Sequence, residues 1–578
     1  MTTILVMMAG TSFLLAFRTP TFDFDEALYR RVAEEMKASH HYGAMTWDGQ
    51  PFLEKPPTYV WMIVGCSRLI DGNSATVSVI ASRLPSLFFS ALTVLLLSLF
   101  WRRFSPSYAA AFGARGRESI ALLGRLPPIA FGAALFPMVQ VTSVLLDPML
   151  TFFTTIVLLV LCVAFLQRTT ANLNLSHGQI AAAAVGMTGA VAVKGLIGIV
   201  APAVAIVAHE LLSTLDRKSK SPFVSLKRRL LGSALGIAPV FVIATALSVI
   251  VFSVFYWFAG PAFLYEFFIR QHFVRGARAL QGHRGPMFYY VLLLFIGGPA
   301  AAFTCVLFGV RKQTHWPFMR WGFPLSWSAG VIAFISLLAT KLPNYTWPAW
   351  PAIALSLCIL FLEKDGGSGL KVPAKVCGWA GIIAASLLSA FAIGLSFGFD
   401  AIIRHEAPST RAHAILSSFT PFPPIVRLGL ILLGLAFAAQ ALLQFQFLRR
   451  AAEDTAALWK TLSAAAAVNC LILLIASSAI VPFMNQTIQA PLVRIARLAS
   501  SSSGKELTTI GLFSPTISSN YSGGRLTQVG TQSSSTALFI TPVWRSQICR
   551  QSPFTVAERD GYLLLCAPKR AMATKTTR

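Results

Sequence analysis

The chain has 578 residues, of which 55% are hydrophobic and only 12% are charged. Soluble domains carry about 25% charged residues. The apolar residues lie in long blocks, such as Leu84–Trp101, Met149–Gln167 and Gly232–Phe258, and blocks of about 20 apolar residues are typical of transmembrane helices. The sequence lacks the alternation of a β-barrel. The composition therefore excludes a soluble globular protein and predicts an all-α polytopic membrane protein.

The formal net charge of +26, from 48 Lys and Arg against 22 Asp and Glu, raises the question of nucleic-acid binding. Many of these cations, however, lie in short runs between the apolar blocks, at 102–117, 217–229, 311–320, 364–375 and 449–450. This is the positive-inside pattern of membrane proteins. No nucleic-acid partner is therefore expected, whereas contact with anionic membrane lipid is.

Placing the basic runs inside gives a consistent topology. It predicts about thirteen transmembrane helices, at 2–17, 79–101, 121–141, 149–167, 179–193, 195–213, 231–258, 287–310, 322–339, 346–362, 376–398, 424–447 and 461–482. The N-terminus is then inside, and the loops 18–78 and 259–286 are outside. Residues 1–482 are expected to form one transmembrane domain that carries these two outer loops.

The tail, residues 483–578, is expected to be a small extracytoplasmic α/β domain. Its cysteines, Cys549 and Cys566, could form a disulfide if the tail faces an oxidising compartment, and the sequence leaves open whether they do. A Ser-rich linker, Ser500–Ser503, comes first, and Gly and Ser separate the strand-like runs as turns require. These runs are Leu507–Phe513, Thr536–Pro542 and Gly561–Ala567. The tail holds no catalytic constellation.

The outer loop 18–78 is unusually acidic for this chain, since seven of the 22 acids lie within Asp23–Glu54. Asp25 is predicted to begin a helix at the membrane surface. Its apolar face is expected to consist of Leu28, Val32 and Met36. A helix dipole stabilises charged carboxylates at the N-terminus, so Asp25 and Glu26 are candidate catalytic groups, with N-capping as the alternative. Glu34 and Glu35 are expected to lie on a solvated face.

The segment Trp47–Met62, WDGQPFLEKPPTYVWM, places Glu54 and Lys55 directly before an apolar stretch that is too short to span a membrane. The proline pair ends any preceding helix and fixes an extended backbone. Charges at membrane depth are costly and often functional. Glu54 and Lys55 are therefore candidate site residues, and a snorkelling lysine with a neighbouring counter-ion is the alternative.

The outer loop Arg270–Tyr290, RQHFVRGARALQGHRGPMFYY, carries cations that the positive-inside rule disfavours on this face. Because Arg matches the geometry of phosphate, Arg270 and Arg275 are predicted to bind a phosphate. Contact with anionic lipid headgroups is the alternative. His272 and His283 lie in the same loop, and His283 alone is a weak signal.

Lys341–Pro351, KLPNYTWPAWP, forms an outer helix junction where Lys341 and Tyr345 are within reach of a headgroup. An interfacial aromatic belt is the alternative. Asp147 and Lys194 each place one charge at an outer helix end, and capping or snorkelling explains either one alone. Together, the outer stretches supply the carboxylates, cations, histidine and aromatics that a phosphate-linked substrate in the lipid would need.

In order along the chain, DEALYRRVAEEM, GQPFLEKPPTYVW, VLLDPMLTFF, VKGLIGIVAP, GHRGPMFYY and KLPNYTWPAWP resemble the motifs of the integral-membrane glycosyltransferases of the C-type fold. The closest likeness is to the lipid A aminoarabinose transferases, and the protein O-mannosyltransferases are more distant. The resemblance covers roughly Ile4–Pro351, and FxEKPPxxxW after an early DE loop is its most specific signal.

This resemblance implies an inverting transfer of a sugar from a polyprenyl-phosphate donor to a lipid A-type or other envelope acceptor. The reaction would take place on the periplasmic face of the bacterial inner membrane. Transfer to Ser or Thr hydroxyls of a protein, as in the O-mannosyltransferases, is the first alternative. A flippase or transporter of lipid-linked sugars is the second.

By the resemblance, Asp25 is the key carboxylate of the first acidic motif, Glu26 supports it, and Lys55 is the catalytic cation. Glu54 and His283 would hold a divalent metal, Zn²⁺ or Mg²⁺, if one is required, and no nucleotide cofactor is implied. The residues assigned to the donor phosphate or its cavity are Lys194, Arg270, Arg275, Lys341, Tyr345 and Tyr59.

One position departs from the pattern. The aminoarabinose transferases tend to have arginine three residues after the aspartate, where this chain has Leu28. Arg31 lies one helical turn further along nearly the same face, so it is expected to substitute in part, whereas Arg30 points elsewhere.

Overall fold

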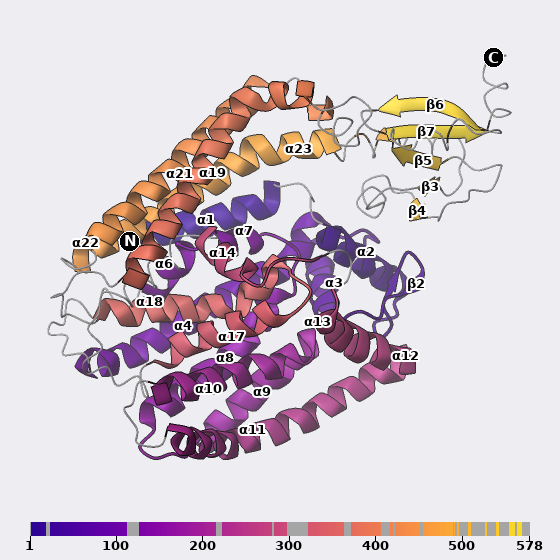
Figure 1. The fold of residues 1–578 in the computed structure, drawn as a ribbon. Coiled ribbons are helices and arrows are strands. Elements are labelled where there is room, and N and C mark those ends of the chain that lie inside the picture. The colour runs from indigo at the N-terminus through magenta and orange to yellow at the C-terminus, as the bar shows by residue number, and fades with distance from the viewer. Residues whose placement is uncertain are drawn as a thin grey trace, which may run out of the picture.

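The computed structural model describes residues 2–18, 24–111, 126–215, 222–279, 283–296, 322–362, 372–405, 417–419, 422–450, 455–488, 491, 494–495, 507–509, 526–528, 539–542, 549, 554–560 and 563–568. Within these ranges most residues are helical, and the long helices pack side by side (Figure 1).

The first half of the chain is helical apart from one short hairpin. Its elements are α1 (Thr2–Arg18), α2 (Phe24–Ser39), β1 (Thr46–Trp47), β2 (Gln50–Pro51), α3 (Thr58–Ile70), α4 (Val79–Ala111), α6 (Leu126–Gly132), α7 (Leu135–Gln140), α8 (Asp147–Gln167), α9 (His177–Lys194), α10 (Ile197–Leu215) and α11 (Pro222–Ala259).

The second half begins with short helices at the end of α11 and returns to long ones. Its helical elements are α12 (Pro261–Leu264), the π-helix η1 (Tyr265–Val274), α13 (Arg275–Ala277), α14 (Tyr289–Ile296), α17 (Phe323–Leu337), the 3-10 helix η2 (Pro343–Ala349), α18 (Trp350–Leu362), α19 (Val372–His405), η3 (Ser417–Phe419), α21 (Pro424–Arg450), α22 (Thr455–Ile475), η4 (Ala476–Ile480) and α23 (Val481–Ile488).

The predicted polytopic helical fold is confirmed. Seven helices among the described residues are long and apolar enough to cross a membrane. Three shorter apolar helices join them, at Val6–Phe17, Thr58–Ile70 and Phe323–Leu337. Most of the expected spans coincide with helices. The span expected at 287–310 is described only as far as Ile296.

Two expected spans differ from single helices, and prolines explain both. The span expected at 121–141 divides into α6 and α7, so that Pro137 lies in the first turn of α7, where a missing N–H costs little. The span expected at 346–362 begins as η2, and Pro351 lies in the first turn of α18. At the C-terminal side, the helical run from α22 continues through α23 to Ile488, past the domain boundary expected at 482.

The largest apolar core lies between α4, α8, α10, α17 and α18. Its biggest fully buried side chains are tryptophans, namely Trp101, Trp327, Trp347 and Trp350. A second core lies beneath the outer loop, where the predicted face of α2 is buried against α3 and α8. Leu28, Val32 and Met36 are 6%, 0% and 1% exposed, which confirms the predicted amphipathic helix.

The segments predicted to lie outside gather at one end of the helix bundle, which is called the outer end below. Figure 1 shows α2, α3, the hairpin strand β2, α12 and α13 at this end, and the C-terminal sheet lies beyond the same end. The hairpin turns through Asp48 and Gly49, whose φ angles are +50° and +76°. Positive φ at both central residues is the geometry of a type I′ turn, for which Asp-Gly is a preferred pair.

The described part of the tail forms a five-stranded sheet in the order β4-β3-β5-β7-β6. The strands are β3 (Leu507–Thr509), β4 (Leu526–Gln528), β5 (Phe539–Pro542), β6 (Phe554–Asp560) and β7 (Leu563–Pro568). β3 pairs in parallel with β4 and β5, and β7 pairs antiparallel with β5 and β6. The three expected strands correspond to β3, β5 and β7, whereas β4 and β6 were not expected. The linker expected at 500–503 lies outside the described residues.

The structure contains a disulfide, which the sequence had left open, between Cys549 and Cys566 of β7. It closes a loop with a sequence separation of 17 residues. A disulfide that closes a loop of this size stabilises a fold by about 3 kcal/mol. Such bonds persist in oxidising compartments, which agrees with an extracytoplasmic tail.

We expect Cys549 and Cys566 to resist maleimide labelling in the denatured protein until a reductant is added. Cysteines that are free in the structure, such as Cys66 and Cys162, should label without it. Peptide mass spectrometry reads both outcomes, and Cys549→Ser should expose one new thiol, that of Cys566. Full labelling of Cys549 without reductant, in protein purified without reducing agents, would contradict the pairing.

Candidate functional site

The most tightly organised charges at the outer end lie where α8 begins and α9 ends. Lys194 Nζ donates to Asp147 Oδ1 at 2.6 Å, and Asn344 Nδ2 donates to Asp147 Oδ2 at 2.8 Å. The Lys194 ammonium also lies 5.2 Å from the centre of the Tyr345 ring. Asp147 is 1% exposed, so its charge is compensated by these two donors. The predicted residues Lys194 and Tyr345 are therefore neighbours, and Asn344 is a partner that the sequence did not single out.

Lys55 lies close to this group. Its partly buried ammonium donates to the carbonyl oxygen of Glu54 at 3.1 Å. Loss of water around it, together with the positive charges of Arg275 and Lys194, lowers the pKa of Lys55 to about 8, against the opposing effect of Glu54 and Asp25. A cation held near other cations, with its charge only partly offset, is well suited to receive an anion.

Tyr29 is the residue that the sequence prediction missed. It lies one turn after Asp25 on α2, is 5% exposed, and its ring packs edge-on against Tyr59 at 5.6 Å. Its hydroxyl has no hydrogen-bond partner among the described residues. Burial raises its pKa well above the usual value, and the negative charges of Asp25, Glu54 and Asp147 raise it further. The spacing of four residues from Asp25 was the available signal.

Tyr59 has a structural anchor as well as a place beside Tyr29. Its hydroxyl lies 2.7 Å from Ser86 Oγ, and Ser86 in turn donates to the carbonyl oxygen of Leu145. Tyr59 is 1% exposed. These contacts tie α3 to α4 and to the segment before α8, so Tyr59 forms a fixed wall rather than a mobile ligand.

The π-helix η1 carries the predicted arginines and docks through a histidine. Its His272 is in contact with both sides of the α9 terminus, since Leu196 N donates to Nε2 at 3.1 Å and the carbonyl oxygen of Lys194 lies 3.2 Å from the same atom. Nδ1 lies 2.7 Å from the carbonyl oxygen of Phe267. Gly195 has a φ of +69°, and a side chain there would collide with His272. Burial lowers the pKa of His272, so the docking histidine is neutral at pH 7.

Arg270 and Arg275 lie on η1 and at its end, and they differ in surroundings. Arg270 is 56% exposed in its side chain and pairs with Glu266 at 3.1 Å, which raises its pKa. Arg275 Nη1 donates to Gln271 at 2.7 Å. Burial lowers the pKa of Lys55, and the positive charge of Arg275 lowers it further. The structure thus brings Arg275 toward Lys55 and Lys194, whereas Arg270 faces solvent.

Lys341 contacts the end of α17. Its ammonium donates to the carbonyl oxygens of Ser336, at 2.7 Å, and Leu338, at the C-terminus of α17. It also lies 5.5 Å from the centre of the Tyr290 ring. Lys341 is 6% exposed, and burial lowers its pKa. The contacts fit helix capping, and a role at the donor phosphate remains a prediction.

The predicted metal pair, Glu54 and His283, does not assemble a ligand set. No group of three or more His, Cys, Asp or Glu side chains lies together among the described residues. The backbone carbonyl of His283 accepts a hydrogen bond from Lys341 N at 2.9 Å. The Glu54 carboxylate lies among cations, since its charge acts on Lys55 and Arg270. Zinc sites use three or four protein ligands, whereas Mg²⁺ is usually held by one or two carboxylates together with substrate phosphates, so a metal at Glu54 and His283 stays a prediction.

Glu26 is engaged in a buried ion pair. Its carboxylate bonds to the guanidinium of Arg83, and the two side chains are 4% and 2% exposed. Arg83 Nη1 also donates to the carbonyl oxygen of Ala16 at 3.0 Å. The pair therefore joins α1, α2 and α4. This anchoring explains Glu26 without contact to a substrate, and its supporting catalytic role stays a prediction.

The expectation that Glu34 and Glu35 are solvated is wrong. Their side chains are only 12% and 16% exposed. Glu34 accepts from Val77 N at 3.1 Å, and Glu35 accepts from the hairpin. Arg31 was expected to substitute in part for an arginine at position 28. Its Nε instead lies 3.1 Å from both Glu35 and Asp48.

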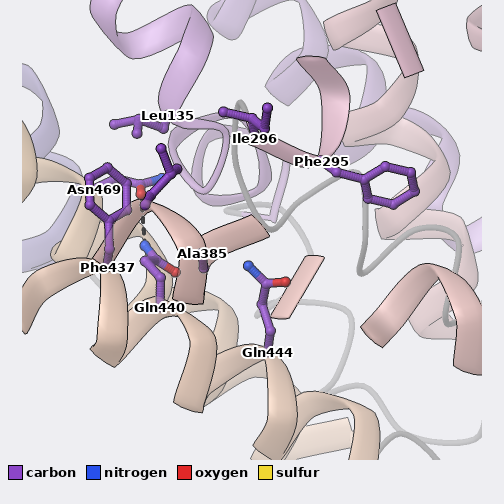
Figure 2. Close-up of a pocket in the computed structure, with 9 residues that line it drawn as sticks. Leu135, Phe295, Ile296, Ala385, Phe437, Gln440, Gln444 and Asn469 are labelled. Carbon is purple, nitrogen blue, oxygen red and sulfur yellow. Dashed lines mark hydrogen bonds between the residues drawn. The ribbon is translucent and has the colours of Figure 1, made fainter. Parts of the chain in front are cut away.

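A small pocket lies elsewhere in the bundle, between α14, α19, α21 and α22 (Figure 2). Its polar lining consists of amides, Gln440, Gln444 and Asn469, and apolar side chains such as Phe295 form the rest. Gln440 Nε2 donates to Asn469 Oδ1 at 2.7 Å, as the dashed line in Figure 2 marks. No titratable residue lines it, so the outer charged cluster, and not this pocket, is the candidate active site.

Comparison with known proteins agrees with the predicted resemblance. No protein-family model matches the chain. It is 24% identical over 342 residues to the undecaprenyl phosphate-alpha-4-amino-4-deoxy-L-arabinose arabinosyl transferases of Yersinia pestis and Yersinia pseudotuberculosis. The match covers 57% of this chain and 53% of each relative, so it spans about half the length of these curated proteins.

Solved structures extend the likeness to nearly the whole chain. The crystal structure of ArnT from Cupriavidus metallidurans bound to undecaprenyl phosphate superimposes with a TM-score of 0.68, at 18% identity, over 98% of this chain and 97% of that one. The apo structure of the same protein gives a TM-score of 0.66. These matches show a shared fold, and together with the sequence matches they confirm the resemblance predicted from the motifs.

We expect Arg83→Met to destabilise the protein by about 3–5 kcal/mol, because it leaves the Glu26 carboxylate buried without its partner. The double variant Glu26→Leu/Arg83→Met should recover most of this loss. Thermal unfolding in detergent measures both changes. A single variant as stable as the wild type would contradict the anchoring role, and a stable but inactive double variant would return Glu26 to the catalytic machinery.

Proposed function

We propose that this multi-pass membrane protein is a glycosyltransferase that uses a polyprenyl-phosphate-linked sugar as donor. Its acceptor is a lipid A-type or other envelope molecule on the periplasmic face of the bacterial inner membrane. The observation that carries the proposal is the meeting of Lys55, Lys194 and Arg275 with the carboxylates of α2 and α8 at one end of the bundle. The named relatives support the same reaction class.

The cations suit the donor. A lipid phosphate is already a good leaving group, so its departure needs stabilisation of negative charge more than a proton. Lys55 is the best placed for this, because its charge is only partly compensated within the protein. Arg275 and Lys194 enlarge the positive field, and Arg270 at the solvent side attracts the anionic headgroup.

The carboxylates suit the acceptor. Asp25 lies in the first turn of α2, one turn before Tyr29. Burial raises the pKa of Tyr29, and the negative charge of Asp25 raises it further. A hydroxyl acceptor must lose its proton during attack, and Asp25 is the group to take it. A phosphate acceptor is already anionic and needs only positioning. Attack from the side opposite the leaving phosphate inverts the anomeric centre.

The reaction is tested with purified protein, a polyprenyl-phosphate-linked aminoarabinose or hexose, and lipid A. Mass spectrometry of lipid A and of envelope glycans from cells with and without the gene gives the same test in vivo. We expect glycosylated product from the wild type. Asp25→Asn should abolish turnover to a hydroxyl acceptor while sparing donor binding, because the substitution removes the base and keeps the shape. Wild-type turnover by this variant would remove Asp25 from the mechanism, and no change in any envelope glycoconjugate would contradict the transferase function.

Donor binding should depend on pH through Lys55. Its pKa is lowered to about 8, so the ammonium loses its proton as the pH rises past that value, and the affinity for undecaprenyl phosphate should then fall by about tenfold per pH unit. Lys55→Arg stays charged and should keep its affinity between pH 8 and 10. Binding isotherms from pH 7 to 10 measure this. Equal pH profiles for the two proteins would show that Lys55 is not the phosphate ligand.

The same shift has a consequence for stability. Because the pKa is lower in the folded protein than in the unfolded chain, the folded state binds fewer protons between about pH 8 and the usual pKa of 10.5. The contribution of Lys55 to the free energy of unfolding therefore rises with pH in that window and is least favourable below pH 8.

A further inference from the structure

The β1–β2 hairpin is held by side chains of α2 that the proposed reaction does not use. We propose that Arg31, Glu35 and Asp48 form a positioning clasp that fixes the Glu54–Lys55 pair in the active site. The proposal rests on the proposed function, because Lys55 is the donor-phosphate ligand there. The three residues are positioning residues, since none of them lies among the groups assigned to the substrate.

Glu35 is the centre of the clasp. Its carboxylate accepts three hydrogen bonds from the hairpin: from Thr46 Oγ1 at 2.6 Å, from Asp48 N at 2.8 Å and from Gly49 N at 3.2 Å. The two backbone donors belong to the turn itself. Successive N–H groups in a tight turn form a small anion-binding concavity, and a charged acceptor makes such bonds about twice as strong as neutral ones. Glu35 thus binds the turn from the side of α2.

Arg31 closes the clasp. Its Nε lies 3.1 Å from Glu35 Oε1 and 3.1 Å from Asp48 Oδ1. Arg31 therefore neutralises Glu35 within α2 and bonds to the turn side chain at the same time. The side chains of the three residues are 16–21% exposed. An exposed ion pair one turn apart on a helix contributes only about 0.3–0.5 kcal/mol, so the contacts to the hairpin are what distinguish this group.

The path from the clasp to Lys55 is short and fixed at both ends. After the turn, Phe52 N donates to the carbonyl oxygen of Met45 at 2.9 Å, and Phe52 is 5% exposed against Tyr29. Beyond Lys55, the prolines lead directly into α3, where Thr58 Oγ1 donates to the carbonyl oxygen of Ala192 near the end of α9. Five residues, Leu53 to Pro57, lie between these fixed points, and Lys55 is the middle one. Release of the hairpin would therefore free the backbone that carries Lys55.

The chain offers a matched control. Glu34 is the neighbouring carboxylate on α2 and is 12% exposed. It accepts from Val77 N at 3.1 Å and lies 3.9 Å from Arg31 Nη1, a longer contact than the 3.1 Å between Arg31 and Glu35, and it makes no contact to the hairpin. Glu34→Gln and Glu35→Gln therefore remove the same charge from adjacent positions. Asp48→Asn keeps a residue that accepts positive φ in a type I′ turn and weakens the bond to Arg31.

The first measurement is the pH profile of Lys55 acylation, read by peptide mass spectrometry on the full-length protein in detergent. In the wild type the midpoint should lie near pH 8, following its lowered pKa. Glu35→Gln and Asp48→Asn should move the midpoint upward by about one pH unit, because a looser Lys55 regains water and leaves its cationic neighbours. Glu34→Gln should leave it in place.

The second measurement is kinetic. The apparent KM for the polyprenyl-phosphate donor should rise about tenfold in Glu35→Gln and less in Asp48→Asn, with the thermal unfolding temperature of Asp48→Asn unchanged. If Glu35→Gln does not fold, Asp48→Asn decides the question. A Lys55 profile that is unmoved in Asp48→Asn, or moved equally by Glu34→Gln, would overturn the clasp. An inactive wild type with shifted Lys55 profiles in the variants would instead overturn the proposed function and leave the clasp standing.

Discussion

The ion pair between Lys194 and Asp147 is the contact on which the outer end of the bundle depends. Asp147 is 1% exposed and receives Lys194 at 2.6 Å and Asn344 at 2.8 Å. A carboxylate that is almost fully buried survives only when it is paired and hydrogen-bonded. The two donors come from the end of α9 and from η2, so one charge holds the outer ends of three segments together.

The same pair sets the electrostatics of the candidate site. Burial lowers the pKa of Lys55 to about 8, and the positive charges of Arg275 and Lys194 act in the same direction. The π-helix η1 then closes over the pair, because His272 bonds to the backbone at Lys194 and Leu196. Arg275 comes near Lys55 through this docking. The position of an outer-loop arginine thus follows from a histidine contact with a helix terminus.

The sequence predicted what periodicity and local chemistry determine. Four-residue spacing predicted the buried face of α2, and long apolar blocks predicted the membrane helices. Two tail cysteines indicated where a disulfide could form. It did not predict contacts that depend on tertiary placement. Glu34 and Glu35 look like surface charges in the sequence, because their donors are distant along the chain. Val77 N donates to Glu34, and Thr46 Oγ1 donates to Glu35. The sequence could not indicate that Lys341 contacts the carbonyl oxygens of Ser336 and Leu338, because every residue carries such an oxygen.

The location of the charges also separates the reaction classes. A transporter of lipid-linked sugars would place its substrate site near the midplane, between broken helices. The polar groups that line the described pocket within the bundle are the amides of Gln440, Gln444 and Asn469, and no titratable residue lines it. A buried ion-pair cluster of Arg168, Glu210 and Arg229 lies at the opposite ends of α8 and α10 from Asp147 and Lys194. The candidate site residues, by contrast, collect at the outer end, beside α2. This arrangement suits chemistry at the membrane surface.

Leu28 shows how the acidic and basic sides of the site are kept apart. At the position where the aminoarabinose transferases tend to have arginine, this chain buries a leucine, 6% exposed, in the apolar core beneath α2. Arg31 is committed to the hairpin, so α2 contributes Asp25 and Tyr29 to the site, while Lys55, Lys194 and Arg275 come from other segments. In the proposed reaction, the cations that bind the donor phosphate therefore come from segments other than α2. Asp25 then lies on the opposite side of the sugar, where an inverting attack begins.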